Sequence, residues 1–390
     1  MKQHNRFKIL LSMAVIVSLI FLLLLSACGN NGNGSDNETP PAAGNYTETD
    51  TDIYNGDDVS DIPQCSDSPI QRNRIGGFPY PYGQIAYQHI AFMSQYLPER
   101  IPFSYRELET ALWIAETLIE KGYSPDDIVI QQFSYEQVQQ YLIWGWTLDL
   151  IERLGWFDGH VRREYSQNVI LTVPGESRQT IIVGAHYDGV LYPGASDNAS
   201  GTALLLESAK RMLNHNNYYT IIYIFFGAEE IGLLGAQFFI ETLPDEDFDN
   251  IVLMINADVL LEGPELTFSA GTIQEVLHLD ENPPFQCNAI QVVYNVAYYL
   301  NYRYDKEFIA FPDGLGLGSD HLPFLWSGLP VVAFWGITLT EYGFMDMQAG
   351  ILHTPYDCYV HITTTWPGRI ERAMESFVML LEGILFADFG

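Results

Sequence analysis

Basic residues are scarce in this 390-residue chain, which has 18 lysines and arginines against 49 aspartates and glutamates. The formal net charge is −31. So acidic a protein repels phosphate groups, which excludes nucleic acid and anionic bilayer surfaces as partners. Cysteine is scarce as well, with four in the whole chain. Apolar residues are plentiful at 47%, so the chain has the composition of a globular protein with a large core.

The first 28 residues have the pattern of a bacterial export signal. Lys2, Arg6 and Lys8 precede the apolar run ILLSMAVIVSLIFLLLLSAC, and small residues come just before Cys28. The stretch LLSACG resembles a lipobox, in which the cysteine receives a diacylglycerol and becomes the mature N-terminus. An uncleaved membrane anchor is the alternative, because a membrane span needs roughly 20 residues. Both interpretations predict a protein held at the cell membrane on its extracytoplasmic face, in the first case by lipidated Cys28.

The cysteines and the composition after the signal set the segment boundaries. Lipidation of Cys28 would leave Cys65, Cys287 and Cys358, an odd number that allows one disulfide at most and excludes a disulfide framework. Residues 29–62 contain no Lys or Arg and few apolar residues, which is typical of a flexible tether. The sequence therefore predicts a lipoprotein signal peptide at 1–27, a lipidated flexible acidic linker at 28–62 and one large domain at 63–390.

From about Cys65 onward, helical patterns alternate with strand patterns. Ser104–Tyr123 begins with a potential helix-capping serine and has apolar residues at helical spacing, as do Ser200–Leu213 and Asn288–Asn301. The strands are apolar throughout, which is typical of a sheet covered on both faces. We therefore expect a three-layer α/β/α fold with a mostly parallel mixed central sheet. The predicted strands are Asp127–Tyr135, Gln167–Val173, Thr180–Asp188, Tyr219–Glu230, Ile251–Asp258 and Pro330–Gly336.

Three of these strands end in side chains that can bind a metal. VGAH ends at His186, GAEE at Glu229 and Glu230, and INAD at Asp258. The carboxyl ends of parallel strands lie along one edge of a sheet, where such folds place ligands, so these residues are expected to converge. One such ending would be unremarkable, but three in one domain favour a site. Because successive residues of a strand point in opposite directions, the two glutamates are expected to face different partners.

Two loops add further candidates to this set. Asp197 lies in YPGASDNASG and His353 in HTPYD. The four carboxylates of the set cannot all stay ionised unaided, since two unit charges ~4 Å apart repel by about 4 kcal/mol at an effective dielectric constant of about 20. Two divalent cations would offset this repulsion. Three carboxylates and two imidazoles suit a pair of Zn²⁺ ions and leave one carboxylate free for proton transfer.

Five segments carry a family resemblance. They are SQNVILTVPG, GAHYDG with GASDNASGTALLLE, FFGAEEIGLLGAQFF, INAD, and GSDHLPFLWSGLPVV with HTPYD. In this order they resemble the co-catalytic zinc aminopeptidase family, which also contains glutaminyl cyclases and carboxypeptidases acting on glutamyl peptides. The similarity runs from about Ile75 to the C-terminus, so it implies a zinc exopeptidase-like catalytic domain within residues 63–390.

The resemblance also implies a metal ligand at each candidate position. Asp197 would bridge two zinc ions. His186 and Asp258 would complete the site of one ion, and Glu230 and His353 would complete the site of the other.

The remaining roles also follow from the resemblance. Glu229 would be the general base, taking a proton from the attacking water and handing it to the leaving amine. Asp188, two residues after His186, would orient that imidazole, with an ordinary turn residue at the strand end as the alternative. In relatives the peptide bond after the bridging aspartate is often cis, so a cis bond is expected at Asp197–Asn198.

One family role finds no counterpart in the sequence. In some relatives a tyrosine near the last histidine ligand stabilises the oxyanion, but here Leu352 precedes His353. Tyr342 and Tyr356 are candidates on proximity in sequence alone. Asp357 is a candidate to orient His353.

The function implied is a membrane-tethered, extracytoplasmic metallo-aminopeptidase that hydrolyses N-terminal residues from peptides. A single-zinc enzyme like the glutaminyl-peptide cyclases is the nearest alternative. SDNASG keeps the aminopeptidase form, AEEIGLLGAQ lacks the tryptophan-containing insertion of cyclases, and Ser319 and Leu352 stand where cyclases usually have an aspartate and a tryptophan. His321 is expected to be a structural histidine. A catalytically inactive surface binding lipoprotein is the other alternative, although every ligand position is filled. The oligomeric state and the preferred substrate residue stay open.

Overall fold

The computed structural model describes residues 80–141, 147–272, 289–311, 318–340, 346 and 350–389. The predicted signal peptide and linker, with Cys28, Cys65 and Cys287, lie outside the described residues. Tyr342 lies outside them as well. In the ranges just given, none of the helices combines the length and the apolar character that crossing a bilayer requires.

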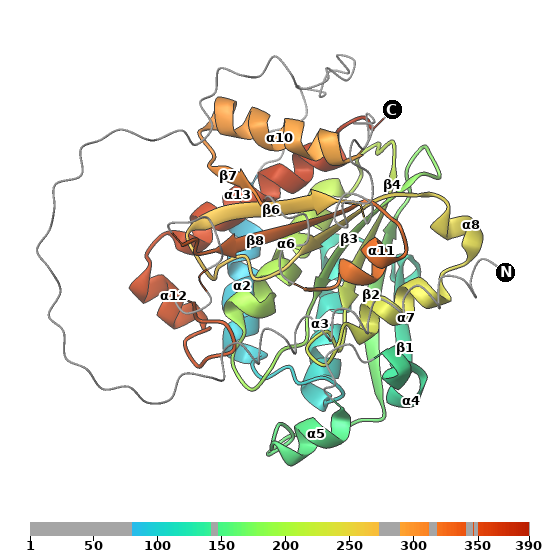
Figure 1. The fold of residues 1–390 in the computed structure, drawn as a ribbon, viewed down its shortest axis with the longest axis vertical. Helices are drawn as coiled ribbons and strands as arrows, with labels where there is room; N and C mark the ends of the chain where they lie inside the picture. Colours follow the sequence, from blue (N-terminus) through green and yellow to red (C-terminus); the bar gives the residue numbers. More distant parts are fainter. Residues whose placement is uncertain are drawn as a thin grey trace, which may run out of the picture.

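The centre of the fold is an eight-stranded mixed sheet with the strand order β1-β2-β4-β3-β5-β8-β6-β7 (Figure 1). The middle four strands, β4, β3, β5 and β8, are parallel to one another. β1 and β2 join antiparallel at one side, and β6 pairs antiparallel with β8 at the other. The predicted mostly parallel mixed sheet is thereby confirmed. The strands are β1 (Ile128–Ser134), β2 (Tyr165–Val173), β3 (Thr180–His186), β4 (Thr220–Phe226), β5 (Ile251–Ala257), β6 (Glu265–Gly271), β7 (Phe308–Ala310) and β8 (Val331–Ile337).

Helices cover both faces of this sheet, which confirms the three-layer prediction. One large apolar cluster packs five helices against one face, namely α2 (Gln84–Tyr96), α3 (Tyr105–Lys121), α6 (Ser200–Met212), α10 (Ala289–Tyr304) and α13 (Arg369–Leu385). A second cluster packs α7 (Leu234–Thr242) and α11 (Leu322–Trp326) against the other face. Shorter helices lie around these layers: α4 (Tyr135–Val138), α5 (Leu148–Arg153), α8 (Asp245–Phe248) and α12 (Tyr359–Thr365).

Local sequence explains where the predicted elements begin and end. α3 begins after Ser104, whose hydroxyl accepts a hydrogen bond from the Glu107 amide at 3.2 Å, as the capping pattern indicated. β4 ends at Phe226, four residues before the predicted end, because Gly227 starts a turn. The short strands β6 and β7 were not predicted.

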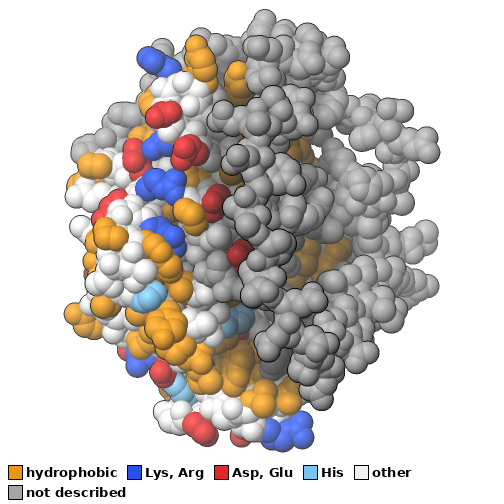
Figure 2. Space-filling view, turned by 60° about the vertical axis from the view of Figure 1, so that its left-hand side comes forward, with side chains coloured by type: hydrophobic (Ala, Val, Ile, Leu, Met, Phe, Trp, Pro, Cys, Tyr) orange, Lys and Arg blue, Asp and Glu red, His pale blue; other side chains and the backbone are white. Residues whose placement is uncertain are grey.

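In the upper left of Figure 2, Lys and Arg side chains are interspersed with Asp and Glu, and hydrophobic side chains gather below them. On α10 and α13 and the loop after α10, Lys306 pairs with Glu375 at 3.1 Å and Arg372 with Glu307 at 3.5 Å. The charges of Lys306 and Arg372 are therefore each offset by an acidic neighbour.

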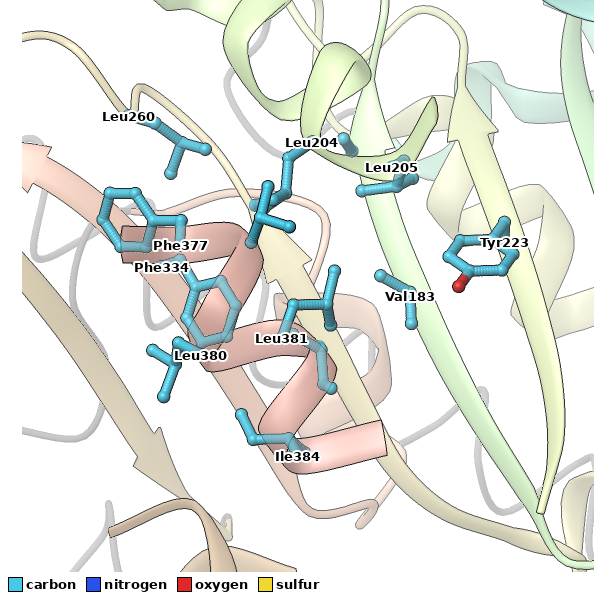
Figure 3. Packing of buried hydrophobic residues seen from close by; sticks show 14 of the residues in the cluster. Val183, Leu204, Leu205, Tyr223, Leu260, Phe334, Phe377, Leu380, Leu381 and Ile384 are labelled. Atoms are coloured by element: carbon cyan, nitrogen blue, oxygen red, sulfur yellow. The ribbon is translucent and has the colours of Figure 1, made fainter. Parts of the chain in front are cut away.

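The core under α13 anchors the C-terminal helix to the sheet. Phe377, Leu381 and Ile384 of α13 are fully buried beside Phe334 of β8 and Leu204 of α6 (Figure 3). Packed side chains of this kind hold the strands in a fixed register, and with them the strand ends.

Truncation of this core should measurably weaken the fold. We expect Leu381→Ala to lower the free energy of unfolding by about 2–5 kcal/mol, because it removes buried methyl groups and leaves a cavity. Urea denaturation followed by circular dichroism measures this loss. Tyr302→Ala is the matched control, since Tyr302 is 82% exposed and its loss should change stability by no more than about 0.5 kcal/mol. Equal effects of both substitutions would contradict the described packing.

Candidate metal centre

The carboxyl ends of three neighbouring strands bring the predicted residues together. His186 is the last residue of β3, and Asp258 directly follows β5. Glu229 and Glu230 lie in the turn between β4 and α7, not in the strand itself. The expectation that an extended backbone separates the two glutamates is therefore wrong, and turn geometry separates them instead. Since β4, β3 and β5 are adjacent, all of these side chains share one edge of the sheet.

Asp197 occupies the middle of the cluster. Its Oδ1 atom lies 3.2 Å from His186 Nε2, and its Oδ2 atom lies 3.0 Å from His353 Nε2. Each imidazole nitrogen has a second acidic neighbour, because Asp258 Oδ1 is 3.1 Å from His186 Nε2 and Glu230 Oε2 is 3.2 Å from His353 Nε2. The five side chains thus form two groups that share one carboxylate.

The donor atoms of these groups are suited to divalent cations. His186, Glu229 and Asp258 each offer one ligand atom, and these atoms lie within 4.8 Å of one another, as do those of His186, Asp197 and Glu230. Glu230 Oε1 is buried without a hydrogen-bond partner among the described residues. Imidazole nitrogen and carboxylate oxygen are typical zinc ligands. Imidazole and carboxylate donors that lie this close together therefore fit a divalent cation such as zinc.

The electrostatics of the cluster show how strongly it attracts positive charge. The charge of Glu230 is the main reason why the pKa of His353 rises to about 12. Burial opposes ionisation of Asp197, but hydrogen bonds from the two imidazoles outweigh it and lower its pKa. Burial likewise raises the pKa of Glu229 well above its usual range. These shifts all favour positive charge between the carboxylates of the cluster.

Solvent reaches the cluster from one side. His186, Asp197 and Asp258 are buried, whereas the side chain of His353 is 51% exposed. Of the ligand candidates, His353 is therefore the one in contact with solvent.

Comparison with known proteins identifies the arrangement. The sequence profile of peptidase family M28 matches residues 168–378, more than half of the chain. The chain belongs to peptidase family M28. This membership confirms the family resemblance that the five sequence segments indicated. Among curated relatives, aminopeptidase YwaD of Bacillus subtilis (strain 168) is 32% identical over 189 residues, which cover 47% of this chain and 37% of YwaD. The match thus spans little more than a third of that relative.

Solved structures share the fold of this M28 chain. A zinc aminopeptidase from Bacillus subtilis superposes with a TM-score of 0.57 at 19% identity, covering 77% of this chain and 94% of that one. A glutaminyl cyclase from an Acidobacteriales bacterium superposes with a TM-score of 0.56 at 18% identity, covering 79% and 97%. At these identities the likeness concerns the fold alone, and it is equally close to both kinds of enzyme.

Asp188 fixes the turn that carries the two glutamates of the M28 site. Its carboxylate accepts hydrogen bonds from the Glu229 amide at 3.0 Å and from the Glu230 amide at 3.2 Å. Its Oδ1 atom lies 3.7 Å from His186 Nδ1, which is too long for a hydrogen bond. Asp188 therefore interacts with His186 through charge, and its hydrogen bonds position the glutamates, a role that the sequence did not indicate.

Asp357 supports a different part of the site from the one expected. Its carboxylate accepts hydrogen bonds from the amides of Ser196 at 2.6 Å and Asp197 at 3.0 Å. The expectation that Asp357 orients His353 is therefore wrong. The peptide bond Asp197–Asn198 is cis, as the resemblance implied.

Two buried residues near the centre escaped the sequence analysis. Glu107 of α3 accepts hydrogen bonds from Ser166 Oγ at 2.6 Å and from the amide of Ala228, directly before Glu229, at 3.1 Å. Asp320 is fully buried, and its charge is one of those that raise the pKa of Glu229, after burial. The pattern S-x-x-E at the start of α3 predicts only a helix cap, so the contacts of Glu107 with Ser166 and Ala228 had no sequence signal.

The two other candidates from the sequence, His321 and Tyr356, differ in burial. The His321 ring is buried and meets Trp335 edge-on, with 5.9 Å between the ring centroids, as expected of a structural histidine. Tyr356 is 61% exposed, and no contact of its hydroxyl supports an oxyanion-stabilising role.

Proposed function

We propose that this M28 chain is a zinc-dependent aminopeptidase that removes N-terminal residues from peptides. The observation that carries the proposal is the position of Asp197, whose two oxygens each face one imidazole at 3.0–3.2 Å. A carboxylate that presents one oxygen to each of two nitrogen ligands suits a bridge between two cations. The family and the named relative support the choice of zinc and of peptide substrates.

His186, Asp258 and Asp197 would hold one zinc ion, and His353, Glu230 and Asp197 would hold the other. Bound zinc supplies an acidified water and a polarised scissile carbonyl. Asp188 orients the glutamate turn through its two amide hydrogen bonds. The exposed side of His353 is the side from which a peptide reaches the centre.

Glu229 is the proposed general base. Its Oε2 atom lies 4.0 Å from His186 Nε2, farther than the 3.0–3.2 Å contacts of the other carboxylates. Among the carboxylates of the ligand set it is therefore the one left free to move a proton. It takes the proton of the attacking water and delivers it to the leaving amine.

We also propose that the catalytic domain within residues 63–390 is tethered to the extracytoplasmic face of the cell membrane. The support is the lipobox-like stretch that ends at Cys28 and the acidic linker at 28–62. Metabolic labelling of the expressed chain with a clickable fatty acid tests this anchor. Label on the wild type and none on Cys28→Ala is expected, and label on neither would contradict it.

Substitution of Glu229 separates catalysis from metal binding. We expect Glu229→Gln to lower kcat by about 10²–10⁴-fold, because the amide cannot take a proton, while zinc content stays at two per chain. The adjacent Glu230→Gln is the matched control, and it should lose zinc. Release of an aminoacyl nitroanilide and metal analysis of the same preparation provide both readouts. A Glu229→Gln variant with normal turnover would refute the assigned base.

Ligand substitutions distinguish the bridging residue from a residue of one site. Asp197→Ala should weaken both zinc sites by at least about 100-fold, since both share its carboxylate. Asp258→Ala should retain the ion held by His353 and Glu230, and therefore bind one zinc. Titration with a chromophoric zinc chelator measures both affinities. One remaining tight site in Asp197→Ala would show that Asp197 does not bridge.

The metal count and the product together decide between the candidate functions. Two zinc ions per chain with chelator-sensitive cleavage of an aminoacyl nitroanilide are expected for the aminopeptidase. One zinc with pyroglutamate formation from a glutaminyl peptide would instead support the cyclase, whose fold is equally similar. A chain without zinc and without turnover would support the binding lipoprotein.

A further inference from the structure

Arg100 is fully buried in the segment between α2 and α3. Its Nε atom donates to the Tyr187 carbonyl at 2.7 Å, and Nη1 donates to the carbonyls of Leu97 at 3.1 Å and Pro193 at 2.8 Å. Nη2 donates to the Gly194 carbonyl at 2.9 Å. A guanidinium group has five N–H donors in a rigid plane, and here that plane is filled with main-chain oxygens.

All of the contacted oxygens except that of Leu97 belong to the two ends of one loop. Tyr187 directly follows His186, and Gly194 precedes Asp197 by three residues. Nη2 also lies 3.4 Å from the carbonyl oxygen of Asp197 itself. The Arg100 carbonyl in turn accepts from the Gly189 amide at 3.0 Å. One side chain therefore fixes the distance between two proposed zinc ligands.

The Arg100 guanidinium is closely packed against the backbone of Gly194. Gly194 has a left-handed backbone with a φ of +59°. A Cβ atom at this position would lie 2.3 Å from the Asp197 carbonyl oxygen and 2.6 Å from Arg100 Nη2. Glycine is thus required at this position, because the guanidinium and the turn approach each other so closely.

The same turn is held from its other side by the buried side chain of Asp357. Asp357 accepts the amides of Ser196 and Asp197, while Arg100 binds the carbonyls of Gly194 and Asp197. The N–H groups of the turn therefore point to a buried carboxylate and its C=O groups to a buried cation. Hydrogen bonds from a charged guanidinium are among the strong ones, so Arg100 holds the carbonyls of the turn firmly.

We propose that Arg100 is a positioning residue of the metal centre, which holds the bridging Asp197 at the proper distance from His186 for two zinc ions. This inference rests on the proposed zinc function. Arg100 touches neither substrate nor metal, and it acts through the loop 187–197.

Zinc affinity of folded variants tests the proposal. We expect Arg100→Met and Arg100→Lys to bind both zinc ions about 10–100-fold more weakly than the wild type. Lysine keeps the charge but has only three N–H donors at one nitrogen, so it cannot reach all five diverging carbonyls. The matched control is Arg211→Met. Arg211 is equally buried but binds Glu207 and the carbonyls of Tyr80 and Pro81, so its variant should keep wild-type zinc affinity.

The measurement is competition with a chromophoric chelator on metal-stripped protein, with circular dichroism confirming the fold. Millimolar guanidinium should restore zinc affinity in Arg100→Ala and have no such effect in Asp258→Ala. Wild-type affinity in folded Arg100→Lys would overturn the proposal, as would an equal loss in Arg211→Met. If Arg100→Met does not fold, Arg100→Lys and the guanidinium rescue still decide.

Zinc affinity and nitroanilide cleavage together distinguish a failure of the Arg100 proposal from a failure of the aminopeptidase proposal. A wild type that binds two zinc ions without cleaving an aminoacyl nitroanilide contradicts the aminopeptidase function, while the zinc affinities still test Arg100. A wild type that binds no zinc overturns both.

Discussion

Repulsion among buried carboxylates is the constraint around which this fold is arranged. Asp197, Glu230 and Asp258 are almost completely removed from water, and Glu229 lies beside them. Carboxylates in such surroundings ionise together only when positive charge is placed between them. The two imidazoles stand in those positions, each 3.0–3.2 Å from two carboxylates. The strand ends, the turns and the buried supports all maintain this alternation of charge.

Three buried acidic residues around the cluster, Asp188, Asp357 and Glu107, bind backbone amides and not the ligand side chains. Asp188 binds the amides of the glutamate turn, Asp357 binds the amides of the Asp197 turn, and Glu107 binds the amide before the glutamates. Each interaction fixes main-chain atoms, so the attached ligand keeps its direction whether or not a metal is bound. Such preorganisation is worth most at a centre whose parts repel one another.

The sequence predicted which side chains lie together because their positions follow from simple rules. Apolar runs mark the buried strands, parallel strands share an edge for their carboxyl ends, and family motifs name the ligands at those ends. The supports of the centre have no such signal. Arg100 meets Gly194 across 94 positions and Asp357 meets Ser196 across 161, and no local pattern specifies such contacts. The placement of Glu229 and Glu230 in a turn was missed for a related reason, since the apolar run continues to the glycine that ends the strand.

These long-range contacts bear on how much of the chain the centre needs. The family profile begins at residue 168, yet Arg100 and Glu107 lie before it and form buried hydrogen bonds with the loops that carry Asp197 and Glu229. A fragment that starts with the profile would contain every ligand of the proposed zinc ions. It would lack the cation that binds the carbonyls of the Asp197 turn and the carboxylate that binds the amide of Ala228. The ligand set and the residues that hold its loops are thus encoded in different parts of one domain, and that domain must include Arg100 and α3.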